Sequence, residues 1–96
     1  MTKTQLNKIL DKIETQFPSN DEIYEDVDNF YEAINDLLDD SVEYLTWDLD
    51  NDTYEFDTAF EEVIESIQNR EKKGKLVKAY TSRMIGSMLV LLISYK

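Results

Sequence analysis

A long central block of this chain carries negative charge alone. Between residues 13 and 69 there are 19 Asp and Glu residues and no Lys or Arg, whereas both ends are basic. The net charge of the 96 residues is −11 at pH 7. Like charges repel, and a block of one sign forms no ion pairs within itself. The apolar side chains must therefore fold this part of the chain against a repulsive charge.

The residue types that are missing exclude several kinds of chemistry. The chain has no Cys and no His. It therefore lacks a thiolate nucleophile, disulfides, the commonest general base and the commonest zinc ligand. The length fits a single domain, residues 1–96. We expect no cofactor, no metal site and no enzymatic activity.

Neither a leader peptide nor a membrane span is expected. The N-terminus is amphipathic, and the longest apolar run, residues 84–93, is shorter than the roughly 20 residues that a bilayer requires. Lys, Asn and Ile are frequent, and their AT-rich codons hint at a low-GC bacterium or its phage. We expect a cytoplasmic protein without membrane contact, acting in the host bacterial cytoplasm if it is phage-encoded.

The spacing of apolar residues predicts an all-α fold. Helices are expected at about 4–17, 21–49 and 57–73, the second either continuous or broken near Asp28 or Ser41. Ser19 with Glu22 forms a capping-box pattern before the second helix. In the second half of residues 75–95, Leu and Met dominate over β-branched residues, which favours a fourth helix. The result is a small bundle of about four helices. The alternative is an α+β fold with a short hairpin at 42–57, in which VEYLTWDL pairs with TYEF.

The segment WDLDNDTYEFD, residues 47–57, resembles the start of a calcium loop without completing one. Asp48, Asp50 and Asp52 match positions 1, 3 and 5 of an EF-hand. Position 6 is Thr53 instead of Gly, and position 12 is Ala59, which has no ligand oxygen. A connecting turn rich in Asp and Asn explains the segment better.

A row of carboxylates follows the second predicted helix. Glu32, Asp36, Asp39 and Glu43 are spaced i, i+4, i+7 and i+11, so a helix would align them over roughly 16 Å. Asp57, Glu61 and Glu65 form a second row. Their spacing is comparable to that of phosphates on duplex DNA, about 3.4 Å per strand. Simple solvation of an acidic surface is the alternative explanation.

Aromatic residues lie among these acids and suggest a protein interface. Tyr and Trp often anchor interfaces, although Tyr rings can also cover a core edge with the hydroxyl in water. The predicted partner-binding surface comprises Glu25, Asp28, Tyr31, Glu32, Asp36, Asp39, Asp40, Glu43, Tyr44, Trp47, Asp48, Asp50 and Asp52.

The segment YEDVDNFYEAINDLLDDSV, residues 24–42, resembles the acidic helices of phage DNA-mimic proteins of the overcome-classical-restriction (Ocr) type. Small acidic anti-CRISPR proteins share its character. The basic segment REKKGKLVK, residues 70–78, departs from a pure phosphate mimic. The resemblance implies an inhibitor that occupies the nucleic-acid-binding cleft of a defence nuclease, such as a Cas effector or a restriction enzyme. Its acids would pair with the Arg and Lys that hold DNA.

Three other functions remain open. An immunity protein or antitoxin that neutralises a nuclease toxin would need the same acidic face. EEVIE, residues 61–65, matches half of the metal-binding motif of all-α nucleotide pyrophosphohydrolases, but the downstream half is missing. The apolar C-terminal segment could also form a homodimer. Direct binding of nucleic acid is disfavoured by the net charge of −11.

Overall fold

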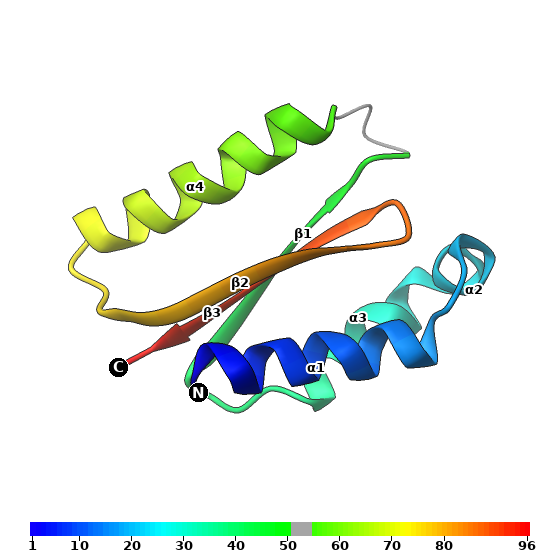
Figure 1. The fold of residues 1–96 in the computed structure, drawn as a ribbon, viewed down its shortest axis with the longest axis horizontal. Coiled ribbons are helices and arrows are strands. Elements are labelled where there is room, and N and C mark those ends of the chain that lie inside the picture. The colour runs from blue at the N-terminus through cyan, green and yellow to red at the C-terminus, as the bar shows by residue number, and fades with distance from the viewer. Residues whose placement is uncertain (51–54) are drawn as a thin grey trace.

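The computed structural model describes residues 1–50 and 55–96 and shows an α+β fold (Figure 1). The elements are α1 (Lys3–Gln16), α2 (Asn20–Glu25), α3 (Val27–Asp36), β1 (Val42–Asp48), α4 (Phe56–Lys72), β2 (Val77–Ile85) and β3 (Met88–Tyr95). The three strands form an antiparallel sheet in the order β1-β3-β2. The predicted all-α bundle is therefore wrong.

The sheet is covered on both faces, and β3 supplies the core on each side. Met88, Val90 and Leu92 pack with α1, α2 and α3, whereas the alternate residues Leu89 and Leu91 pack against α4. Figure 1 shows α4 on one side of the sheet and α1 and α3 on the other. Seven of the eight β3 residues are buried. The C-terminal strand therefore contributes to the cores on both faces of the sheet, and the acidic sides of the helices remain at the surface.

The segment predicted as a fourth helix is the hairpin β2–β3. Gly86 and Ser87 connect the two strands, and Gly86 has a positive φ of 59°. A strand that is buried on both faces reads as a continuous apolar run, so its periodicity does not distinguish it from a buried helix. A two-residue Gly-Ser connection between apolar runs is a hairpin signal, and in this segment it outweighs the preference of Leu and Met for helices.

The helix predicted at 21–49 is interrupted twice. Asp26 ends α2 and caps α3 by accepting a hydrogen bond from the Asn29 N–H at 3.2 Å. After α3, the Asp39 side chain accepts a hydrogen bond from the Ser41 N–H at 2.8 Å. Such local side-chain bonds compete with helical hydrogen bonding, and the chain continues as β1.

The alternative hairpin at 42–57 is only half right. Residues 42–48 do form a strand, but its partner is β3, and Phe56 already belongs to α4. Residues 51–54, which include the first half of the expected second strand TYEF, lie outside the described part of the chain.

The first and third predicted helices are confirmed as α1 and α4. In α1 the predicted apolar face is buried. In α4 the buried residues are Ala59, Val63 and Ile67, whereas Phe60 and Ile64, which the helical spacing assigns to the core, are each 45% exposed. Among the described residues, no helix has the length and apolar character needed to cross a membrane.

Candidate acidic interface

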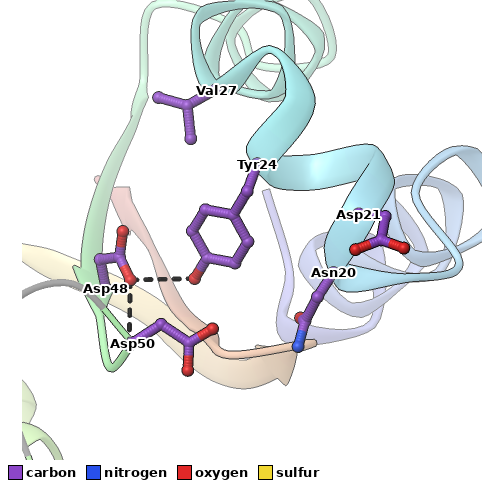
Figure 2. A pocket seen from close by; sticks show the side chains of 6 residues that line it. All are labelled: Asn20, Asp21, Tyr24, Val27, Asp48 and Asp50. Atoms are coloured by element: carbon purple, nitrogen blue, oxygen red, sulfur yellow. Dashed lines mark hydrogen bonds between the residues drawn. The ribbon is translucent and has the colours of Figure 1, made fainter.

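A hollow of about 570 Å³ opens between α2 and the end of β1 (Figure 2). It is lined by Asn20, Asp21, Tyr24, Val27, Asp48 and Asp50. Tyr24 projects from α2 towards β1, where its hydroxyl donates a hydrogen bond to Asp48 Oδ1 at 2.9 Å. The same oxygen accepts the backbone N–H of Asp50 at 3.1 Å. The hollow thus combines three carboxylates with a tyrosine whose position is fixed.

The environment of Tyr24 keeps its hydroxyl protonated. Burial raises the pKa of Tyr24, and the hydrogen bond to Asp48 and the charges of Asp48 and Asp50 raise it further. A phenolate beside two carboxylates would be repelled, whereas a protonated hydroxyl donates to one of them. Tyr24 therefore acts as a fixed donor that positions Asp48.

A second, smaller hollow of about 290 Å³ lies between α3 and the middle of β1. It is lined by Asp28, Tyr31, Glu32, Asn35 and Tyr44. The rings of Tyr31 and Tyr44 stack with centroids 6.4 Å apart. Tyr44 projects from the sheet face that packs on α1–α3, so the stacked pair closes the gap between strand and helix. Two carboxylates and two tyrosine rings meet here.

The two hollows have neighbouring residues in their linings, and we call the two together the acidic edge. Val27 lines the first hollow and Asp28 the second. The strand β1 forms one side of both, and it is an edge strand of the described sheet. The acidic edge carries the carboxylates Asp21, Asp28, Glu32, Asp48 and Asp50 and the rings of Tyr24, Tyr31 and Tyr44. No Lys or Arg of the described chain lines either hollow.

The arginines form their ion pairs elsewhere. Arg70 on α4 holds Glu43 with two hydrogen bonds, of 2.8 Å from Nε and 3.0 Å from Nη2. The Tyr95 hydroxyl donates to the same carboxylate. The Arg70 guanidinium lowers the pKa of Glu43 to about 2, against the opposing effect of burial, and Tyr95 adds to the lowering. On β2, Arg83 contacts Asp11 and Glu14 of α1.

The structure separates the residues that the sequence grouped together. Six of them lie on the acidic edge: Asp28, Tyr31, Glu32, Tyr44, Asp48 and Asp50. Glu25, Asp36, Asp39 and Asp40 are exposed but line neither hollow. Glu43 and Trp47 lie on the opposite sheet face, towards α4, because β1 is a strand and alternates its side chains. Asp52 lies outside the described residues.

The predicted carboxylate stripe is therefore wrong as a single row. Only Glu32 and Asp36 share a helix, since α3 ends at Asp36. Asp39 lies in the following turn, where its hydrogen bonds from Ser41, led by that of the hydroxyl, lower its pKa. Glu43 is held by Arg70.

Two residues of the acidic edge were left out of the predicted partner-binding surface. Asp21 is one of several acids in the second helix, and nothing in its neighbours distinguishes it. Tyr24 reaches Asp48 across 24 positions of sequence. Such a contact depends on how α2 packs beside β1. The spacing of residues within one segment does not predict that packing.

The chemistry of the acidic edge follows from its carboxylates and its tyrosine rings. In the described part of the chain, no group of three or more Asp or Glu side chains is arranged to hold a metal ion. What it presents is charge-assisted hydrogen-bond acceptors beside flat aromatic rings. These groups suit Lys and Arg side chains, which pair with carboxylates and stack on aromatic faces.

Comparison with known proteins gives no assignment. No protein-family model, no curated protein and no solved structure matches the chain. The likeness to DNA-mimic proteins therefore remains a prediction from the pattern of acids and aromatics.

Proposed function

We propose that this protein is a small acidic inhibitor that occupies the nucleic-acid-binding cleft of a bacterial defence nuclease, of the anti-CRISPR or anti-restriction kind. The observation that supports this proposal is the acidic edge, which has five carboxylates and three tyrosines and no Lys or Arg among the described lining residues. A cleft that binds nucleic acid presents Arg and Lys at phosphate spacing. Carboxylates that are already positioned would pair with those cations.

The preorganised side chains support binding over simple solvation. Tyr24 is hydrogen-bonded to Asp48, and Tyr31 is stacked on Tyr44. Fixed side chains lose less conformational entropy when a partner binds. Carboxylates that served only solubility would gain nothing from such positioning.

The first experiment finds the partner and asks whether it binds nucleic acid. A tag is attached after the exposed Lys96, because the Met1 amine donates a hydrogen bond to Ser94. The tagged protein is incubated with nuclease-treated lysate of a low-GC bacterium that carries CRISPR and restriction systems. Bound proteins are eluted first with duplex DNA or guide RNA and then with salt. We expect a basic nuclease in the first eluate, and inhibition of its cleavage by this protein.

The second experiment locates the surface with the purified partner. We expect the double variant Asp28→Asn, Glu32→Gln to weaken binding by at least about tenfold, since charge pairs at interfaces commonly contribute more than about 1.4 kcal/mol. The matched control is Glu55→Gln, Glu71→Gln, which removes the same charge from exposed positions that line neither hollow.

Two outcomes would reject the proposal. A partner that nucleic acid fails to displace would indicate a different surface, such as that of a toxin–immunity pair. Equal weakening by both double variants would show that net charge, rather than the acidic edge, determines binding.

A further inference from the structure

The strand β1 is bonded to β3 along one edge only. At one end of the pair, the Leu49 N–H donates to the Ser87 carbonyl at 2.9 Å. At the other end, the Tyr95 N–H donates to the Ser41 carbonyl at 2.9 Å. Because bonding residues alternate along an antiparallel strand, the odd-numbered residues of β1 turn their backbone N–H and C=O groups towards β3. The even-numbered residues turn these groups away from it.

Tyr44 and Thr46 carry the outward groups that are available to a further strand. Among the described residues, none bonds to the N–H or C=O that either of them turns away from β3. None of the seven residues of β1 is fully buried, and no described helix has its backbone packed along the strand. An edge strand with unpaired backbone groups is a template for the addition of another strand.

The hollows of the acidic edge lie along this strand. On that face of the sheet, α1 packs over β2, and α3 lies beside α1 on the side of β1. Tyr44 lines the second hollow and Asp48 lines the first (Figure 2). Both positions are even-numbered, so the two side chains lie on one face of β1. They are about 13 Å apart along the strand, at about 3.3 Å per residue.

An antiparallel strand added to β1 would bring two of its side chains to the hollows. Residues directly opposite each other in such a pair project from the same face. The residues opposite Tyr44 and Asp48 are therefore four positions apart, and each lies beside one hollow. The residues on either side of the one opposite Thr46 project from the other face. There they lie beside Leu45 and Trp47, which pack with the core under α4, so apolar side chains suit those positions.

The charge of the hollows determines which side chains suit the other two positions. Five carboxylates and no Lys or Arg are found among the described lining residues. Arg binds a carboxylate through two parallel hydrogen bonds and stacks on aromatic faces such as those of Tyr31 and Tyr44. A second copy of the chain does not suit this edge, because two β1 strands paired about Thr46 would bring two acidic edges together.

We propose that β1 accepts an extended segment of the partner as an additional antiparallel strand, with two arginines four positions apart seated in the two hollows. The segment alternates these polar positions with apolar ones. This inference rests on the proposed function, because it specifies the contact by which the inhibitor holds its partner. The backbone bonds supply affinity, and the spacing of the arginines supplies specificity.

A peptide tests the contact without the nuclease. The probe is Thr-Arg-Val-Thr-Val-Arg-Thr, capped at both ends, and its binding is followed by NMR of the protein amides. We expect a dissociation constant below about 1 mM. At nine-tenths saturation, hydrogen exchange of the Thr46 amide should slow about tenfold, since exchange then requires the free form. The Trp47 amide, which faces β3, should change little. The isomer Thr-Arg-Val-Thr-Arg-Val-Thr, whose arginines project from opposite faces, should bind at least about tenfold more weakly.

Removal of single N–H groups separates backbone pairing from charge. Methylation of the central Thr amide of the probe, which faces β1, should weaken binding at least about tenfold. Methylation of the first Val amide, which faces away, is the control. In the protein, Thr46→Pro removes an outward N–H and leaves the bonds to β3 in place, so it should abolish peptide binding. Thr46→Val keeps the N–H and should bind normally. If Thr46→Pro does not fold, the two methylated peptides decide the question.

Several results would overturn the proposal. No binding at about 1 mM, equal binding of the two arginine isomers, or equal effects of the two methylations would each exclude it. Protection of the Thr46 amide that rises with protein concentration alone would show that a second copy occupies the edge.

The nuclease partner separates this inference from the proposed function. A Thr46→Pro variant that inhibits the nuclease normally would exclude strand addition and leave the proposed function standing. Specific peptide binding, together with a partner that nucleic acid fails to displace, would support strand addition and exclude the proposed function.

Discussion

At the scale of single residues, Gly86 lies where the β2–β3 hairpin meets the start of α2. Asn20 Oδ1 accepts the Ser87 N–H at 2.9 Å, and Asn20 Nδ2 donates to Ser87 Oγ at 3.1 Å. A Cβ at position 86 would lie 2.0 Å from Asn20 Oδ1. The glycine thus permits both the positive φ of the turn and the approach of the neighbouring helix.

We predict that Gly86→Ala lowers the free energy of unfolding by about 2–3 kcal/mol, from backbone strain at positive φ and displacement of Asn20. Gly74→Ala is the control, because Gly74 also has a positive φ but a Cβ added there would meet no atom of the described chain within 4 Å. It should cost only about 1 kcal/mol. Urea unfolding of both variants measures the difference, and equal losses would contradict the role of Asn20.

Glu43 gives the protein a specific acid sensitivity. Its pKa is lowered to about 2 in the folded protein, from an ordinary value of 4.5. A lowered pKa stabilises the folded state above the unfolded pKa, and this contribution is lost as pH falls from about 4.5 towards 2. We predict that Glu43→Gln costs about 1–3 kcal/mol at about pH 6, and that this difference declines steadily below about pH 4.5.

The measurement is urea unfolding of the unchanged protein and of Glu43→Gln at several pH values. The difference between their free energies of unfolding removes the contributions of the other carboxylates. Asp40→Asn, at an exposed carboxylate, is the control and should give a small difference. A Glu43→Gln difference that stayed constant from about pH 6 to about pH 2.5 would show that the contact with Arg70 does not depend on the charge of Glu43.

At the scale of elements, β3 determines the fold because it faces two cores. We predict that Leu91→Ala and Leu92→Ala each cost about 2–5 kcal/mol, since each leaves a cavity in a different core. Both residues are fully buried, one against α4 and one against α1–α3. Leu76→Ala, at a residue 67% exposed, should cost less than about 1 kcal/mol. A small effect of either buried substitution would mean that one face of β3 is not packed.

The sequence predicted the elements that have one apolar face and failed on those that do not. The helix α1 buries Leu6, Ile9 and Leu10 at helical spacing, so its position was predictable. In β3 the apolar residues are consecutive, and local spacing does not separate strand from helix. The Gly86-Ser87 turn was the available signal for the hairpin.

The residue types of the candidate site were predictable from the sequence, but their arrangement in space was not. The acids and tyrosines of residues 21–50 do provide the surface, as their abundance suggested. Which of them meet depends on the end of α3 at Asp36 and on the alternation of β1. That alternation turns Glu43 and Trp47 towards α4 and leaves Tyr44 beside Tyr31.

At the scale of the whole molecule, the net charge of −11 should make the fold weaker at low ionic strength. Salt screens repulsion between exposed carboxylates over a Debye length of about 10 Å at 0.1 M. We predict that raising NaCl from about 10 to 500 mM increases the free energy of unfolding by about 1 kcal/mol or more. Urea unfolding at the two salt concentrations measures this. A decrease would mean that salt bridges such as Arg83 with Asp11 outweigh the repulsion.

The place of β3 in the sheet also bears on synthesis of the protein. Strands β1 and β2 meet only through β3, which is the last strand of the described sheet to leave the ribosome. The nascent chain therefore exposes the apolar residues of α1, α3 and α4 until β3 has been synthesised. During that interval its acidic central block would repel neighbouring nascent chains. The negative charge that destabilises the folded protein would therefore protect the incompletely synthesised chain from aggregation.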